Sequence, residues 1–177
     1  MPIKRVIEVI HAPELMKLEN NLNSTEEICT LTHLASVSSD LITCLVGEKI
    51  GSGCYRTVYE YNLDKKYVIK IEPLNTNCNV TEYMLWNEIK DLRGNLAWVK
   101  DWFEPVKWIS PNGRVLVMQR TKSDYKKAKP KKIPKFMWDV KDDNFGWIGN
   151  KFVCHDYGQF YNFIHYSKAM QDVGDRW

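Results

Sequence analysis

The spacing of apolar residues divides the chain into a helical N-terminal part and a strand-rich remainder. From Ile28 to Leu45, apolar residues recur mainly at helical intervals, after the capping-box pattern Ser24-Thr-Glu-Glu27. Residues 13–20 also look helical, whereas residues 1–10 fit a strand or a helix equally well. We therefore predict a helical extension over residues 1–45, which either braces the rest of the chain or binds a partner.

From residue 46 the pattern becomes one of short strands and turns. Residues 46–59 read as a hairpin around a glycine-rich turn, and residues 67–72 read as the next strand. Two further strands are expected at residues 98–103 and 114–118. In the strand over 67–72, Ile69 and Ile71 share one face, and Val68, Lys70 and Glu72 share the other.

Residues 80–93 give the clearest helical pattern, with Asn79 as the cap and Gly94 as the stop. Glu82 falls on the apolar stripe of this helix, and Glu88 lies off it. An inward-facing carboxylate requires a cation, so we expect Glu82 to have a basic partner. The alternative is a local capping box, Asn79-x-x-Glu82, which would use the Glu82 carboxylate at the start of the helix. The apolar stripe consists of Leu85, Trp86, Ile89 and Leu92.

A second hairpin is predicted near the C-terminal end of the chain. Residues 145–148 and 151–154 read as its strands, and Gly149-Asn150 is a two-residue turn signal. The hairpin would bring Asn144 and Asp156, at its two open ends, close together. A carboxylate and an amide oxygen form a hard-oxygen site that suits Mg²⁺.

The segment Asp139-Val-Lys-Asp-Asp-Asn144 resembles the catalytic loop of protein kinases, Asp-x-Lys-x-x-Asn. His155-Asp156-Tyr157-Gly158 resembles the Asp-Phe-Gly metal loop of the same family. The resemblance implies that Asp139 accepts the proton of a substrate hydroxyl and that Lys141 lies near the transferred phosphate. It also implies that Asn144 and Asp156 hold the Mg²⁺.

The glycine-rich turn, Gly51-Ser52-Gly53, followed by Val58 and then by Val68-Ile69-Lys70, resembles the nucleotide-binding strands of kinases. By this resemblance Lys70 contacts the α- and β-phosphates of ATP and pairs with a glutamate of the αC helix. Glu82 is our choice for that glutamate, with Glu88 as the runner-up. Arg56 stands where the family has its third glycine, and would either stiffen the loop or bring a cation over the phosphates. The hinge that binds adenine would be Met118, Gln119 and Arg120, with Met118 as gatekeeper.

The resemblance implies an α+β, protein-kinase-like fold: a five-stranded antiparallel N-lobe sheet with an αC helix, and a C-lobe that is mostly missing. Residues 46–121 would form the N-lobe, and residues 122–177 a minimal catalytic and metal-binding layer with a C-terminal helix. Met137-Trp138 replace the His-Arg of the family, and no room remains for an activation segment. The chain in this respect resembles compact kinase-like proteins of phages and bacteria.

Composition adds little to this prediction. The formal net charge is +3, five cysteines are scattered without metal-ligand spacing, and no apolar run reaches the length of a membrane span. We therefore expect a cytoplasmic protein without a membrane partner. The lysine-rich residues 122–135 are typical of a solvated linker, with an acidic partner as the alternative. Nucleic acid is unlikely as a ligand here, because Tyr125 is the only aromatic residue in the tract.

The sequence favours an ATP- and Mg²⁺-dependent phosphotransferase similar to serine/threonine protein kinases, with a protein or a small molecule as phosphate acceptor. The alternative is a catalytically inactive kinase-like protein that binds and modulates a host partner. Nucleotidyl transfer on the same scaffold is a third hypothesis.

Overall fold

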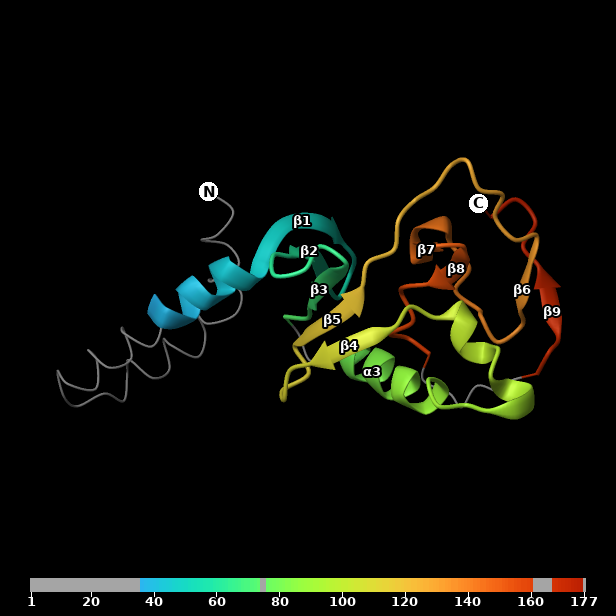
Figure 1. The fold of residues 1–177 in the computed structure, drawn as a ribbon, viewed down its shortest axis with the longest axis horizontal. Helices are drawn as coiled ribbons and strands as arrows, with labels where there is room; N and C mark the ends of the chain where they lie inside the picture. The colour runs from blue at the N-terminus through green and yellow to red at the C-terminus, as the bar shows by residue number, and fades with distance from the viewer. Residues whose placement is uncertain (1–35, 74–75, 161–166, 177) are drawn as a thin grey trace.

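The computed structural model describes residues 36–73, 76–160 and 167–176. Our predictions for residues 1–35 lie outside this range. Residues 36–45 form a helix that runs directly into the first strand of the central sheet (Figure 1), which agrees with the helical pattern expected there. In the described ranges, no helix is both long enough and apolar enough to cross a membrane.

A five-stranded antiparallel sheet forms the centre of the molecule, as predicted, and makes the fold a mixture of helix and strand (Figure 1). Its strand order is β1-β2-β3-β5-β4. The glycine-rich turn joins β1 to β2, with Ser52 paired opposite Thr57 next to the turn, and the pairing of the two strands has two register shifts farther along β1. The strands are β1 (Val46–Ser52), β2 (Thr57–Tyr61), β3 (Tyr67–Ile71), β4 (Val106–Ile109) and β5 (Val115–Gln119).

The two faces of β3 have different surroundings, as its alternating pattern predicts. Ile69 and Ile71 pack with Val117 of β5 on one face. Val68 belongs to the larger hydrophobic core on the opposite face. Lys70 is buried on that second face, where it meets the long helix of the molecule. The strand therefore directs its one lysine toward the interior of the molecule.

The long helix, α3, spans Cys78–Ile89 and contacts β4 and β5. It begins after Asn77, whose backbone is left-handed with φ of 61°. The expected cap, Asn79, is instead inside the first turn and fully buried. Its backbone N–H donates to Glu72 Oε2 at 2.8 Å, so the predicted capping box with Glu82 does not form.

The strand predicted at residues 98–103 is wrong. Two 3-10 turns, Gly94–Leu96 and Val99–Trp102, occupy this region, and the strand β4 begins only at Val106. Val99 and Phe103 are both buried, four residues apart, while Asp101 between them is exposed. This spacing is helical rather than alternating, and it was hidden by the many aromatic residues of the segment.

The predicted C-terminal hairpin is present, with β7 (Phe145–Ile148) paired to β8 (Lys151–Cys154). Gly149 in its turn has φ of 56°, a conformation that glycine adopts without strain. The helix expected after Gly158 is not found in the part described: β9 (Met170–Asp172) pairs with β6 (Lys132–Pro134). Because Ile133 and Val173 are both fully buried at this pairing, the end of the chain and part of the lysine-rich tract fold as a strand pair.

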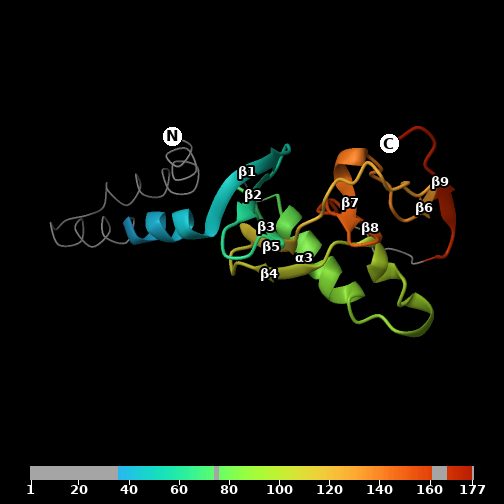
Figure 2. The same cartoon turned by 45° about the horizontal axis from the view of Figure 1, so that its top comes forward.

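The hairpin is anchored to the segment that precedes β4. A parallel bridge joins Phe103 to Cys154, and the Glu104 N–H donates to the Cys154 carbonyl at 2.9 Å. The Phe103 ring meets the edges of Tyr157 and Phe160 at centroid distances of 5.1 and 6.1 Å. One hydrophobic core therefore runs from α3 and the sheet to the hairpin, and Figure 2 shows the two parts side by side. The domain boundaries at residues 45/46 and 121/122 stay a prediction.

Candidate functional site

A buried ion pair joins the central sheet to α3. Lys70 Nζ lies 3.0 Å from Glu82 Oε2 and 3.1 Å from Glu82 Oε1. Lys70 Nζ also donates to the backbone carbonyl of His155, immediately before Asp156. The cation that we expected for the inward-facing Glu82 is therefore Lys70, and this lysine reaches the loop that follows the hairpin.

Glu82 is fully buried, and it is supported by three separate donors. Besides Lys70, these are the guanidinium of Arg56, at 2.7 Å, and the backbone N–H of Tyr157, at 3.0 Å. A buried carboxylate is tolerated only when cations and N–H groups satisfy its oxygens in this way. Glu82 therefore fixes the helix, the glycine-rich turn and the Asp156 loop to one point.

Arg56 enters the site from the start of β2 and is 8% exposed. Its guanidinium bonds both oxygens of Glu82, the side-chain oxygen of Asn79 at 3.4 Å, and Asp156. Burial alone would lower the pKa of Arg56, but the carboxylates of Glu82 and Asp156 outweigh burial and raise this pKa above its ordinary value. Arg56 is a permanent cation that points into the site.

A second cluster forms around Asp139. Lys141 Nζ lies 2.9 Å from Asp139 Oδ1, and the Asn144 side-chain amide donates to Asp139 Oδ2 at 2.9 Å. The hydrogen bond and the charge of Asp139 raise the pKa of Lys141. Within the described residues, the amide oxygen of Asn144 accepts no hydrogen bond, which leaves it available to a ligand.

The hairpin brings this cluster to the Asp156 loop. At its open end the His155 N–H donates to the Asn144 carbonyl at 2.8 Å. The His155 ring Nε2 lies 2.8 Å from the carbonyl of Asp143, which only accepts, so Nε2 carries the proton. Nδ1, 2.9 Å from Thr121 Oγ1, is then the acceptor. Burial, followed by the nearby Lys70, lowers the pKa of His155 to about 4, so the ring is neutral at physiological pH.

Asp156 is the exposed acid of the site, with 51% of its side chain accessible. Burial raises its pKa, but the positive charges of Lys70 and Arg56 outweigh burial and lower it, so Asp156 is ionised at neutral pH. The next two residues fit tightly: the Tyr157 hydroxyl donates to the Glu104 carbonyl at 2.7 Å. A Cβ on Gly158 would lie 2.8 Å from the Cβ of Cys78.

The glycine-rich turn lies next to Arg56. Ser52 and Gly53 are exposed and Gly51 is half-buried, and the Gly53 N–H closes the turn on the Arg56 carbonyl at 2.9 Å. Val58 is opposite Lys70 in the β2–β3 register. The turn and Lys70 therefore belong to neighbouring strands.

The predicted hinge residues are at the end of β5 and just beyond it. Met118 is fully buried in the core. The Gln119 N–H donates to the Pro105 carbonyl at 2.9 Å and the Arg120 N–H to the Lys66 carbonyl at 2.7 Å. These two N–H groups are occupied by the protein itself, so only carbonyl oxygens of this pair are left to meet an adenine base.

Glu104 is a site residue that the sequence did not reveal. It is 1% exposed, and within the described residues neither of its carboxyl oxygens has a hydrogen-bond partner. Burial raises the pKa of Glu104 well above its ordinary value, against the opposing charge of Lys70. Its position before Pro105, outside any motif, gives no signal in the sequence. Glu104 is therefore a buried carboxyl group, favoured in its neutral form, that lies next to the charged cluster.

The oxygen atoms of the site are of the type that binds a hard cation. They are few, so water and a bound ligand must complete the coordination shell of the cation. Among the residues described, no group of three or more His, Cys, Asp or Glu forms a metal cluster. The free oxygens are those of Asn144 and the second carboxylate oxygen of Asp156. Mg²⁺ commonly keeps several waters and takes one or two protein oxygens, so these residues fit such an ion.

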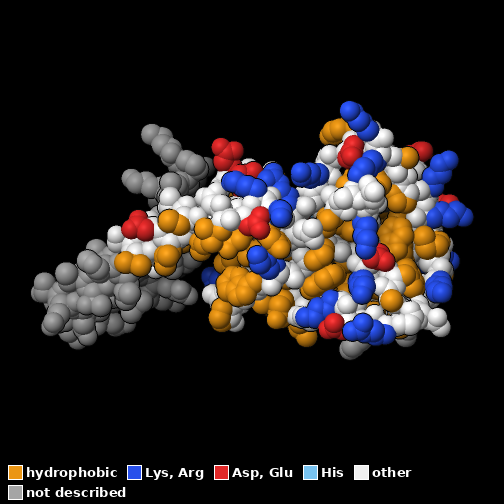
Figure 3. All heavy atoms as spheres, viewed as in Figure 1, with side chains coloured by type: hydrophobic (Ala, Val, Ile, Leu, Met, Phe, Trp, Pro, Cys, Tyr) orange, Lys and Arg blue, Asp and Glu red, His pale blue; other side chains and the backbone are white. Residues whose placement is uncertain are grey.

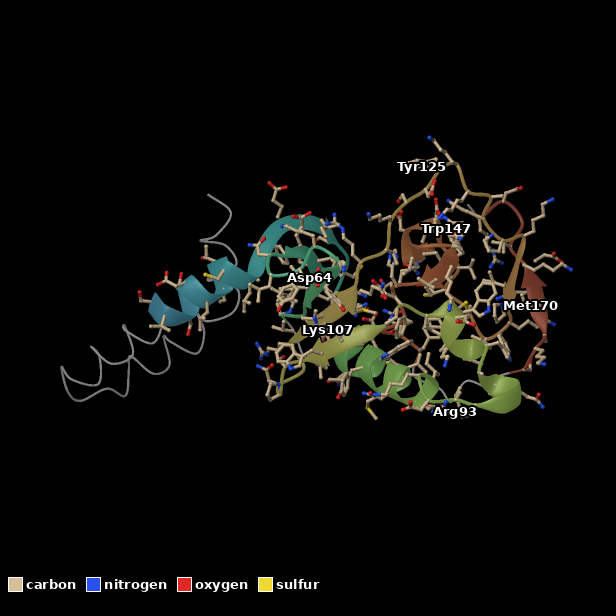
Figure 4. All side chains as sticks on the ribbon, viewed as in Figure 1. Asp64, Arg93, Lys107, Tyr125, Trp147 and Met170 are labelled. Atoms are coloured by element: carbon tan, nitrogen blue, oxygen red, sulfur yellow. The ribbon has the colours of Figure 1, made fainter. Side chains whose placement is uncertain are left out.

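The lysine-rich tract passes over the hairpin. Lys127 lies over the Trp147 ring, 5.0 Å from its centroid, and Lys129 pairs with Asp142 at 2.5 Å. Tyr125, labelled with Trp147 in Figure 4, is 93% exposed. Figure 3 shows lysine and arginine side chains spread around this part of the surface, with hydrophobic side chains between them.

Comparison with known proteins gives no family. No family model matches the sequence, and no curated protein matches it. One solved structure, the streptomycin–ATP–APH(2")-IIa ternary complex, aligns with a TM-score of 0.34 and 16% identity. The alignment covers 58% of this chain and 30% of that chain. Similarity at this level carries no argument about function.

Proposed function

We propose that the protein is a kinase-like phosphotransferase that uses ATP and Mg²⁺. The observation that carries the proposal is the contact of Lys70 with both Glu82 and the His155 carbonyl, beside Asp156. A lysine on a sheet, a glutamate on a helix and an aspartate after a hairpin are the charged groups with which kinases hold ATP phosphates and metal. Here Lys70 pairs with Glu82, and Arg56 pairs with both Glu82 and Asp156.

In this proposal Lys70 contacts the phosphates, and the free oxygens of Asn144 and Asp156 bind Mg²⁺. The metal, when bound, would neutralise charge on the phosphate oxygens. The glycine-rich turn, which includes Gly51 and Gly53, would cover the phosphates with its backbone N–H groups. Met118 and the carbonyls of Gln119 and Arg120 would border the adenine.

Asp139 is the proposed proton acceptor for the substrate hydroxyl. Its carboxylate is held by Asn144 and Lys141, and it is one-quarter exposed, so a hydroxyl can approach it. Lys141 Nζ, beside it, would contact the phosphoryl group during transfer. The arrangement relies on positioning and charge, which are the main sources of catalysis in phosphoryl transfer.

The division into lobes, the phosphate acceptor and the cellular location are proposed from the sequence alone. Residues 46–121, with α3 in the place of the αC helix, would act as the N-lobe, and residues 122–177 as a reduced C-lobe. The acceptor would be a protein serine or threonine, or a small molecule, in the cytoplasm of a bacterium or of a phage-infected host.

The test is transfer of γ-labelled phosphate from ATP in the presence of Mg²⁺, with host extract as the acceptor. Asp139→Asn and Lys70→Ala should each abolish transfer, because they remove the proton acceptor and the phosphate contact. Lys49→Ala is the matched control, since Lys49 is an exposed lysine of β1. Transfer that survives both site variants would refute the proposal.

The second candidate is an inactive kinase-like binding protein, and the Arg56–Asp156 ion pair favours it, because a guanidinium already neutralises the proposed metal ligand. Nucleotide binding, measured as a thermal shift with Mg·ATP, without any transfer would support this second function. The absence of both a thermal shift and phosphate transfer would refute both proposed functions.

A further inference from the structure

Asp156 is already paired with a positively charged side chain of the protein itself. The Arg56 guanidinium makes the direct ion pair with Asp156, and it bonds Glu82 through both of its terminal nitrogens. We infer that Arg56 is a resident cation of the proposed metal site, which a divalent cation must displace from Asp156 in order to bind. The inference rests on the proposed function, since it concerns the same site.

The position of Arg56 on the chain allows such an exchange. Thr57, the next residue, is paired with Ser52 and with Ile71, so the backbone beside Arg56 is fixed in the sheet. The contact with Asp156 is made by the end of a long side chain. Rotation of this side chain alone would free the carboxylate, without movement of a strand.

The charges of the cluster favour replacement of Arg56 by the divalent cation at Asp156 over binding of both cations at the same time. Arg56 and Lys70 supply two positive charges, and Glu82 and Asp156 supply two negative charges. A divalent ion at Asp156 would share its carboxylate with the guanidinium at contact distance, and although this carboxylate is half exposed, the guanidinium is buried. Repulsion between the two cations is strong under these conditions.

Two further acids in the described part of the site, Glu104 and Asp139, offer no free carboxylate to a second cation. Burial raises the pKa of Glu104 well above its ordinary value, which disfavours a negative charge on its carboxyl. The carboxylate of Asp139 is paired with Lys141 at 2.9 Å. Thus the metal and Arg56 depend on one carboxylate, and each weakens the binding of the other.

Loss of Arg56 should act on Asp156 more than on Glu82. Without the guanidinium, Glu82 keeps Lys70 and the Tyr157 N–H. Within the described residues, Asp156 would lose its one direct ion pair. A variant without the arginine should therefore bind a divalent ion more tightly while the Lys70–Glu82 pair stays in place.

The experiment measures Mn²⁺ binding, without nucleotide, from the relaxation of water protons. Arg56→Gln should lower the dissociation constant for Mn²⁺ by about tenfold or more, the equivalent of one charge-assisted hydrogen bond. Lys49→Gln, which removes one exposed positive charge from β1, should change it by less than about twofold. In the double variant Arg56→Gln/Asp156→Asn the gain should disappear.

Each outcome decides the inference. An Arg56→Gln protein that binds Mn²⁺ no more tightly than the wild type, while Asp156→Asn abolishes binding, overturns it and leaves the proposed metal site intact. Binding that does not depend on Asp156 in any variant overturns both the inference and the proposed metal ligand. Should Arg56→Gln not fold, Arg56→Lys decides in its place: it loses the two-pronged contact, and binding should tighten by about threefold.

Discussion

Replacement of Glu104 with glutamine tests the effect of burying a carboxyl group beside the site. In the folded protein burial raises the pKa of Glu104 well above its ordinary value of 4.5. In the unfolded chain the same carboxyl ionises above about pH 4.5. Above this pH the unfolded chain therefore binds fewer protons than the folded chain, and the free energy of unfolding falls as pH rises. The loss ends only at the raised pKa of the folded state.

The magnitude follows from the linkage. Each pH unit inside this window costs roughly 1.4 kcal/mol of stability for one group. Glu104→Gln is neutral at every pH and removes this cost. As pH rises from 5, the stability of the variant relative to the wild type should therefore rise at this rate until the pH reaches the raised pKa of Glu104 in the folded protein.

The assay is urea unfolding followed by tryptophan fluorescence at pH 5, 6 and 7, and the quantity compared is the difference between variant and wild type. The difference is essential because His155 acts in the opposite direction: its pKa, lowered to about 4, makes stability rise with pH up to about 6.5. Glu48→Gln, at an exposed position of β1, is the control and should show little change. A difference that is the same at pH 5 and pH 7 would refute the reasoning.

Three further predictions concern the loop after the hairpin, all measured by urea unfolding. Tyr157→Phe removes the hydrogen bond to the buried Glu104 carbonyl and should cost about 1–2 kcal/mol; an unchanged midpoint would contradict the contact. Gly158→Ala brings a Cβ to 2.8 Å and 3.0 Å from atoms of α3 and should cost about 1–3 kcal/mol, whereas Gly51→Ala, with no neighbouring atom within 4 Å, should cost less than about 1 kcal/mol. Equal costs for Gly158→Ala and Gly51→Ala would show that the loop moves to accommodate the added Cβ. His155→Gln should flatten the loss of stability on acidification from about pH 6.5 to 4, because only the unfolded wild type takes up this proton there.

The local parts of the fold were predictable from the sequence because their signals are local. Strands β1, β2 and β3, the helix α3 and the β7–β8 hairpin each follow from alternation, a helical stripe or turn residues within a short window. The strand at residues 98–103 was predicted wrongly, because a run of aromatic residues suits both a strand and a 3-10 turn. The pairing of β6 with β9 joins segments that are far apart, and no pattern within either segment indicates it.

The candidate site was likewise predictable from the sequence only in part. The pairing of Lys70 with Glu82 was expected from the kinase resemblance, together with the place of Glu82 on the apolar stripe of its helix. The direction of Arg56 was left open, since a sequence does not say whether a loop side chain turns outward or toward a helix. Glu104 was missed because its importance comes only from burial, which depends on the packing of Phe103 and Tyr157 around it. The catalytic roles of Asp139, Asn144 and Asp156 stay predictions.

The separations along the chain between the contacting residues imply an order of assembly. Lys70 and Glu82 are 12 residues apart, and Asp139 and Asn144 are 5 apart, so each half of the site closes over a short loop. By contrast, Glu82 and Tyr157 are 75 residues apart, and Arg56 and Asp156 are 100 apart. Contacts over long loops form late, because the entropy of closing the loop must first be overcome. During synthesis, therefore, the chain through Tyr157 must leave the ribosome before the two halves meet, and until then Arg56 and Asp156 each remain without the other.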